Sequence, residues 1–144
     1  MLYERESKNI MAAAAEMPAD KYNYHPTADQ WTFGRLVSHI AQSNRTLCSA
    51  LSGEAAPAAP QVAVPAAKPE LDAELKASFD FCGKALDGLT DAKLAEMVTL
   101  FRGTHMPRAM ALLALTADLP DHYSQMAGYL RLNGMLPPSA QPRR

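Results

Sequence analysis

The stretch DHYSQMAGYLRLNG at residues 121–134 has the pattern of the last turns of a long helix. Apolar residues recur in it at helical spacing. Asn133-Gly134 then supplies the kind of residues that end a helix in a left-handed conformation. His122 lies inside this apolar stretch. A histidine in such a position is either a polar member of the core, which is the commoner case, or a ligand for a metal ion.

Three segments upstream also repeat apolar residues at helical spacing. They cover residues 2–17, 32–53 and 69–88. Pro18 ends the first segment, and Thr32 can cap the second, which Gly53 can end. Pro69 suits the first turn of the third. The sequence therefore predicts four substantial helices.

The last helix is expected to start at Thr104 as its cap, with Pro107 in its first turn, and to run to Leu132. Pro120 lies inside this helix. Because proline donates no hydrogen bond and its ring displaces the preceding turn, it is expected to kink the helix or to split it in two.

The connections between the helices are uneven in length. Residues 54–68 are rich in alanine and proline and predict an extended linker that can cross the end of a bundle. Residues 91–97 predict a short helix capped by Thr90, and residues 98–101 have a brief β-like character. Together the elements predict an all-α fold, a four-helix bundle with a long crossover connection, in a single domain over residues 1–144.

Composition excludes several classes of function. Hydrophobic residues make up 48% and charged residues 20% of the 144 residues, and the formal net charge is −1. This balance gives no electrostatic footprint for nucleic acid. No apolar run approaches the ~20 residues that span a bilayer, and no basic start followed by a long apolar stretch resembles a secretory signal. We expect a cytoplasmic protein with a small-molecule partner, and neither a nucleic acid nor a membrane as partner.

The two cysteines, Cys48 and Cys82, each fall in a predicted helix and lack the spacing of a zinc site. Reduced cysteine behaves as a small hydrophobic side chain. The sequence therefore predicts that both are buried free thiols.

Three residues are candidate metal ligands. His39 lies at the edge of the second helix's apolar stripe, in line with Ser43, and His122 lies in the last helix. Asp118 precedes His122 by four residues, so the two share a helix face. Facing helices of a bundle build metal sites from such inward side chains. Two histidines and a carboxylate suit a divalent metal such as zinc, iron, manganese or nickel, with positions left for water or substrate.

Asp118 also has a purely structural interpretation. The run Asp118-Leu119-Pro120-Asp121 has the form of a helix cap with proline in the first turn and an acid three residues on. If the helix breaks at Pro120, Asp118 is its cap and not a ligand. The sequence leaves the two roles open.

Several motifs together resemble the DinB family of four-helix bundles. They lie in residues 17–27, with Met17-Pro18, Lys21-Tyr22 and Pro26-Thr27; in FGRLVSHIA at 33–41; and in residues 121–138, from DHYSQM to Pro137-Pro138. They cover nearly the whole chain in the expected order. The resemblance implies a four-helix bundle, often a homodimer, with a three-histidine metal site. His39 and His122 match two of those histidines. The third falls at Asp118, and Ser124 replaces a glycine usual in the family.

The resemblance also implies a class of reaction. Relatives with assigned activities resemble transferases and isomerases that use a metal to activate a low-molecular-weight thiol. The expectation is a metal-dependent, thiol S-transferase-like enzyme that uses His39, His122 and Asp118. The alternative is a metal-free bundle with a degenerate site, which binds a small ligand or only dimerises.

Overall fold

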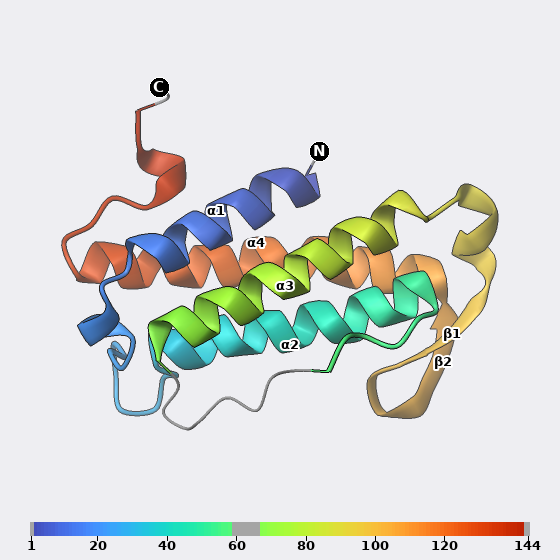
Figure 1. Ribbon diagram of the computed structural model, residues 1–144, viewed down its shortest axis with the longest axis horizontal. Helices are drawn as coiled ribbons and strands as arrows, with labels where there is room; N and C mark the ends of the chain where they lie inside the picture. The colour runs from blue at the N-terminus through green and yellow to red at the C-terminus, as the bar shows by residue number, and fades with distance from the viewer. Residues whose placement is uncertain (1, 59–66, 143–144) are drawn as a thin grey trace.

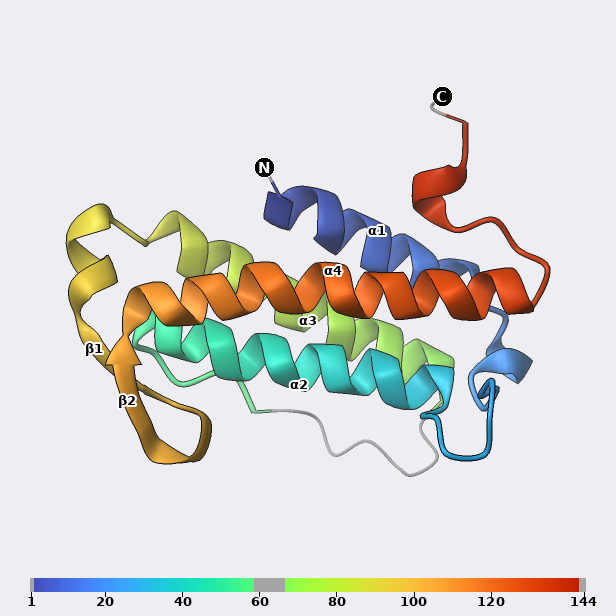
Figure 2. The same ribbon diagram turned by 180° about the vertical axis from the view of Figure 1, so that it is seen from behind.

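A bundle of four helices forms the body of the protein. The computed structural model describes residues 2–58 and 67–142. Its helices are α1 (Leu2–Glu16), α2 (Phe33–Ser52), α3 (Lys68–Asp87) and α4 (Arg108–Leu132). Helices α1 and α2 each pack against both α3 and α4, as the two opposite views show (Figure 1, Figure 2). This confirms the predicted bundle. The predicted linker at 54–68 lies mostly outside the described residues, and its last residue already begins α3.

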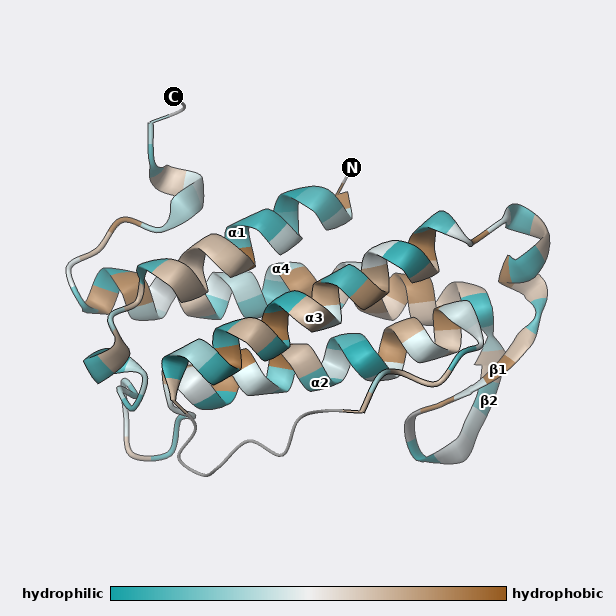
Figure 3. Ribbon diagram, viewed as in Figure 1, coloured by the Kyte–Doolittle hydropathy of each residue, from teal (hydrophilic) through white to brown (hydrophobic). Residues whose placement is uncertain are grey.

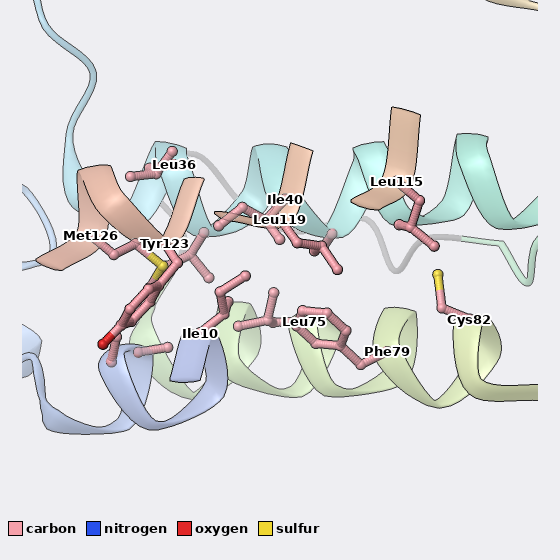
Figure 4. Close-up of a cluster of buried hydrophobic side chains, with 14 of the residues drawn as sticks. Ile10, Leu36, Ile40, Leu75, Phe79, Cys82, Leu115, Leu119, Tyr123 and Met126 are labelled. Carbon is pink, nitrogen blue, oxygen red and sulfur yellow. The ribbon is translucent and has the colours of Figure 1, made fainter. Parts of the chain in front are cut away.

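Apolar side chains from all four helices meet in one core. Hydrophobic residues are interspersed with hydrophilic ones along each helix (Figure 3). Apolar residues that recur once per helical turn bury one face of a helix. Ile10 of α1, Ile40 of α2, Leu75 of α3 and Leu119 of α4 are each almost completely buried and point into the same cluster (Figure 4). Burying one such side chain contributes about 1.5–3 kcal/mol. Among the described residues, no helix is long and apolar enough to cross a membrane.

Helix α2 begins and ends where its sequence predicts. The Thr32 hydroxyl accepts a hydrogen bond from the Arg35 backbone amide at 3.1 Å. At the other end Gly53 has a φ of 81°, and its amide donates to the Ser49 carbonyl at 2.8 Å. Glycine adopts this left-handed conformation without the penalty that a side chain brings.

Helix α4 runs without a break through Pro120. The missing amide of Pro120 leaves the Thr116 carbonyl without its usual intrahelical donor. The Thr116 hydroxyl itself donates to the carbonyls of Leu112 and Leu113. Of the two outcomes expected at Pro120, a kink or a split, the split is therefore wrong. Asp118 lies inside the helix, so its interpretation as a cap is wrong as well.

A small hairpin precedes α4, where the sequence predicts the start of the helix. Strand β1 (Met97–Leu100) pairs antiparallel with β2 (Thr104–Pro107), and α4 begins only at Arg108. The chain reverses through Arg102 and Gly103, which have φ values of 55° and 79°. Thr104 pairs with Leu100 and does not cap α4. Residues Asp91–Ala95 form a 3-10 helix, η2, with no side-chain cap from Thr90.

Arg108 fastens this hairpin to the bundle. One guanidinium nitrogen, Nη1, donates to the carbonyls of Ala50 and Leu51, which belong to the last turn of α2 and lack partners in that helix. The other, Nη2, lies 2.7 Å from the Glu96 carboxylate just before β1. A buried cation at the negative end of a helix is a favourable arrangement. Arg108 thus joins α4, the end of α2 and the base of the hairpin.

Cys48 of α2 and Cys82 of α3 form a disulfide. Both residues are completely buried, as predicted, but the prediction of free thiols is wrong. Their Cα atoms lie 5.1 Å apart, within the usual range for a disulfide. Helices α2 and α3 run in the same direction (Figure 1), and sequence spacing alone does not show which of their residues face each other, so it could not reveal this pair.

Helix α1 is shorter than the helices on which it packs. It has 15 residues, compared with 20 in α3 and 25 in α4. At 1.5 Å per residue, α4 is about 15 Å longer than α1. The start of α1 lies well short of the hairpin end of the bundle (Figure 2). At that end, α3 and α4 pack on α2 but are not covered by α1.

Candidate functional site

His39 of α2 and His122 of α4 meet where these two helices pack. Their ring centroids are 5.0 Å apart and the rings are tilted by 47°. His122 is buried, whereas His39 is partly exposed beside the buried Ile40. The prediction that these histidines approach each other across the bundle is confirmed. The reason is that each lies at the edge of its helix's apolar face, and these edges meet when the faces pack.

Asp118 fixes the orientation of the His122 ring. The Nδ1 atom of His122 lies 2.8 Å from the Asp118 backbone carbonyl and 3.4 Å from Oδ2 of its carboxylate. Both oxygens can only accept a hydrogen bond, so Nδ1 carries the proton. The other ring nitrogen, Nε2, is then the one whose lone pair is available in the neutral ring.

Ser43 holds the Asp118 carboxylate from the facing helix. Its hydroxyl donates to Oδ2 of Asp118 at 2.8 Å. Burial alone would raise the pKa of Asp118, but the hydrogen bonds from His122 and Ser43 outweigh it and lower that pKa. The carboxylate therefore stays ionised beside His122. Ser43, Asp118 and His122 form a connected polar chain between α2 and α4.

The pKa values of the two imidazoles are shifted in opposite directions. Burial lowers the pKa of His39, and the neighbouring His122 lowers it further. For His122, burial also favours the neutral ring, but the hydrogen bond and charge of Asp118 outweigh burial and raise its pKa. His39 is therefore the stronger candidate for a neutral nitrogen ligand, and His122 is the residue that holds a proton more tightly.

Trp31 and Arg35 border the site on the His39 side. The Trp31 ring lies edge-on to His39, with centroids 4.8 Å apart, and the Arg35 guanidinium lies 4.6 Å above the Trp31 ring. The Tyr129 hydroxyl donates to the Trp31 backbone carbonyl at 2.6 Å. Trp31 remains 37% exposed, so it covers His39 without closing the site. Trp31 lies in the loop before α2, so helical spacing in the sequence gives no signal for this contact.

The remaining histidines, His25 and His105, are exposed. His25 lies in the loop before α2, and its Nδ1 is 2.7 Å from the Thr27 carbonyl. His105 lies on β2, and its Nδ1 is 3.3 Å from the Thr99 hydroxyl oxygen. Each makes a local contact, so neither is brought into the pair formed by His39 and His122.

The donor set fits a metal only in part. Within residues 2–58 and 67–142, no three His, Cys, Asp or Glu side chains gather as a group that could hold a metal ion. Two imidazoles in contact can supply two nitrogen ligands. The Asp118 carboxylate instead faces Nδ1 of His122 and the Ser43 hydroxyl. Carboxylates in this position orient the histidine ligands of many metal sites.

Solved structures with the same fold include two from Bacillus. A DinB-like protein from Bacillus cereus ATCC 10987 is 18% identical, with a TM-score of 0.75 over 94% of this chain and 91% of its own. The DinB-like protein YjoA from Bacillus subtilis is 20% identical, with a TM-score of 0.77 over 97% and 96%. A mycothiol-dependent maleylpyruvate isomerase is 17% identical, with a TM-score of 0.65 over 87% of this chain and 57% of its own.

Likeness at this level of identity shows the shared fold alone. No curated protein matches the chain in sequence. The model of one family, the DinB superfamily, matches residues 2–126, which include α1, α2, α3 and both histidines of the pair. The chain therefore belongs to the DinB superfamily.

Proposed function

We propose that the site between α2 and α4 binds a divalent metal, either zinc, nickel, iron or manganese, and acts with it on a small molecule. His39 and His122 are its nitrogen ligands, and Asp118 orients His122 through Nδ1. The single observation that carries this proposal is the paired imidazoles, one of which has its ring fixed by a carboxylate. Asp118 becomes a third ligand if its Oδ1 turns to the metal, since its contacts with Ser43 and His122 both use Oδ2.

The reaction class that we propose is a thiol-dependent transfer or isomerisation. A low-molecular-weight thiol that coordinates a metal loses its proton and becomes a nucleophilic thiolate. The isomerase that shares this fold is named for its dependence on mycothiol, although this chain spans only 57% of that protein's length. The contribution of His39 is a neutral ring at the open side of the site, consistent with its lowered pKa.

Arg35 gives the open side of the site a positive charge. Its guanidinium is exposed and stacks on Trp31, which in turn contacts His39. Among the described residues it has no carboxylate within ion-pair distance. An exposed guanidinium of this kind pairs well with a carboxylate. We therefore expect the small thiol, or the molecule that it attacks, to carry a carboxylate.

A second candidate function rests on the polar chain itself. Ser43, Asp118 and His122 satisfy one another without a metal. This favours a bundle that binds a small ligand between α2 and α4 with no metal, the degenerate-site alternative. The two functions differ in one measurable quantity, the metal content of the protein.

Elemental analysis of protein purified without a histidine tag or chelator tests the proposal. The enzyme hypothesis expects close to one divalent metal per chain, or saturable zinc binding after a chelator has removed it. His39→Ala should weaken zinc binding by at least about tenfold. His105→Ala, which removes an exposed histidine from β2, is the matched control and should bind like the parent. Absent metal and no saturable zinc binding would leave the metal-free function.

The thiol is tested separately on the metal-loaded protein. Calorimetry with N-acetylcysteine, which carries both a thiol and a carboxylate, should show binding. Arg35→Gln should weaken it, whereas Arg131→Gln in the last turn of α4 should not. N-acetylserine has a hydroxyl in place of the thiol. If the protein bound it as tightly as N-acetylcysteine, the role of the thiol would be contradicted.

The assembly and compartment that we propose are a homodimer in the cytoplasm. Met110 and Leu113 on α4 are 44% and 59% exposed, which is large for apolar side chains. Apolar residues at the surface of a helix often mark a subunit contact. Sedimentation at increasing concentration tests this. A single species of 15.6 kDa at every concentration would refute the dimer.

A further inference from the structure

A concave pocket of about 620 Å³ lies at the uncovered end of the bundle, apart from the histidine pair. The start of α1, the end of α3, η2 and the first half of α4 form its walls. The pocket exists because α1 is too short to cover α3 and α4 at this end. Its volume is within the range of small-molecule sites. Neither His39, His122 nor Asp118 lines it.

Half of the residues that line the pocket are leucines. Seven of them line it, contributed by α1, α3, η2, the segment between α3 and η2, and α4. Leu115 and Leu119 are almost fully buried and form its floor, whereas Leu86 and Leu112 are partly exposed along its sides. An apolar surface of this shape gains free energy when an apolar body displaces its water.

The charged residues that line the pocket are all acidic. They are Glu4, Asp87 and Asp91, and no lysine, arginine or histidine lines it. Glu4 already has an interaction partner. Asp87 and Asp91 are exposed, and among the described residues neither lies in an ion pair. Lys93 on η2 donates to the Gly88 carbonyl.

The negative charge of Asp87 acts on Tyr3 in the pocket wall. Tyr3 lines the pocket and donates its hydroxyl to the Phe79 carbonyl at 2.7 Å. Burial, together with the charges of Asp80 and Asp87, raises the pKa of this phenol to about 12. A second negative group is therefore disfavoured here, and a positive one is favoured.

We propose that this pocket binds a small organic cation with an apolar body, such as an alkyl- or arylammonium ion. The apolar body lies on the leucines, and the ammonium group lies at Asp87 and Asp91. Charge decides between this occupant and a second copy of the chain. Symmetric pairing through this face would bring two acidic rims together, which is unfavourable.

Gly83 offers a direct way to block the pocket. It lines the pocket within α3, and a Cβ built on it meets no atom within 4 Å. The Cβ of Gly83→Leu therefore enters open space at the pocket wall, and leucine favours a helix more than glycine does. Gly128 in α4 also has open space around a built Cβ but does not line the pocket. Gly128→Leu is the matched control.

The test is binding of n-octylammonium, with n-octanol and octanoate as neutral and anionic analogues. Calorimetry gives the affinities, and methyl NMR of the protein locates the site. We expect octylammonium to bind at least about tenfold more tightly than octanoate, a difference that one favourable charge contact supplies. Shifts should appear at Leu115 and Leu119. Gly83→Leu should abolish them, and Gly128→Leu should leave them.

The acidic residues are tested with the same probes. Asp87→Asn combined with Asp91→Asn should remove the preference for the cation and leave octanol binding unchanged. Asp20→Asn combined with Asp29→Asn, both exposed and ahead of α2, is the control for net charge.

Three results would overturn the proposal. They are no binding of octylammonium at millimolar concentration, equal affinity for octanoate, and binding that survives Gly83→Leu. Sedimentation that shows a dimer abolished by Gly83→Leu would instead assign the pocket to a second copy of the chain. None of these results depends on metal at the histidine pair, so this proposal and the proposed function fail separately.

Discussion

The hydroxyl of Ser43 on α2 donates to the carboxylate of Asp118 on α4 at 2.8 Å, across 75 positions of sequence. This hydrogen bond joins the two helices that carry the histidine pair. It also explains why Asp118 faces His122 through Nδ1. The carboxylate is held from both sides, by a hydroxyl on the facing helix and by an imidazole one turn along its own helix.

Asp118→His restores the residue type that the family pattern has at this position. Imidazole suits zinc and nickel better than a carboxylate does, and its longer reach can bring a nitrogen toward His39 and His122. We expect zinc affinity to rise by about tenfold or more, an effect of the size that changes at metal sites produce. Zinc titration measures it.

Asp121→His is the control for that variant, since Asp121 is exposed on α4 and contacts Gln125. A gain in affinity of the same size in Asp121→His would show that the added histidine acts outside the site. Unchanged affinity in Asp118→His would remove position 118 from the ligand set.

Asp118→Asn should lower the pKa of His122 in metal-free protein. The Asp118 carboxylate raises that pKa against burial, and the amide carries no charge to do so. The resonance of His122 in an NMR titration should therefore shift its midpoint to lower pH. A midpoint that does not move would show that the carboxylate is not the cause.

Two helical glycines should respond in opposite directions to alanine. A Cβ on Gly34 would lie 3.2 Å from the Tyr22 carbonyl oxygen, which cannot move aside as a flexible side chain can. Gly34→Ala should cost about 1–3 kcal/mol, the range for overpacking. Gly128 has open space, so Gly128→Ala should stabilise by about 0.5–1 kcal/mol through helix propensity. Denaturant unfolding of both variants checks the signs.

The disulfide between Cys48 and Cys82 should stabilise the fold. The two residues are 34 positions apart, and a cross-link across a loop of this length is expected to contribute about 3–4 kcal/mol by restricting the unfolded chain. The double variant Cys48→Ala with Cys82→Ala should therefore unfold at a lower denaturant concentration. A midpoint equal to that of the reduced parent confirms that the cross-link is responsible, and one equal to the oxidised parent contradicts it.

Stability should fall at alkaline pH in part because of Tyr3. Its phenol has a pKa of about 12 in the folded protein, above the ordinary value of 10.0. The folded state therefore holds this proton more tightly. The resulting stability is fully present below pH 10 and is lost as the pH rises towards 12. Because the ring is partly exposed, screening reduces the effect.

Tyr3→Phe tests that assignment. It removes the ionisable hydroxyl, and with it the hydrogen bond to the Phe79 carbonyl, at a cost of about 0.5–1.5 kcal/mol at neutral pH. The variant should lose less of its remaining stability between pH 10 and 12 than the parent does. Tyr22, whose pKa burial and Asp72 also raise, keeps part of the effect in both proteins. Parallel pH profiles would contradict the role of Tyr3.

Local signals predicted those parts of the fold that depend on near neighbours in sequence. Thr32 and Gly53 mark the ends of α2 because a cap and a left-handed glycine act within one turn. His39 and His122 could be paired because each lies on a helix edge and the family pattern aligns those edges. The same local rules misplaced the start of α4, because Thr104 followed by Pro107 matches a cap as well as it matches a strand.

What failed depends on contacts between distant residues. The role of Ser43 requires the register of α2 against α4, and the disulfide requires that of α2 against α3. The cap-like motif around Asp118 is overridden because the helix on both sides of Pro120 packs into the core, where Leu119 and Met126 are almost fully buried. The local motif at Asp118 allowed either a cap or a position inside the helix, and tertiary packing decided between them.

The position of Arg108 has a consequence for how the protein can change. Its contacts with Ala50, Leu51 and Glu96 hold the hairpin at its base, whereas Arg102 and Gly103 at the tip are exposed. Chain added at an exposed tip disturbs little when the base is fixed. The tip is thus a place where a peptide or a label can be inserted while the helices keep their registers, which makes the hairpin a convenient handle for following this protein.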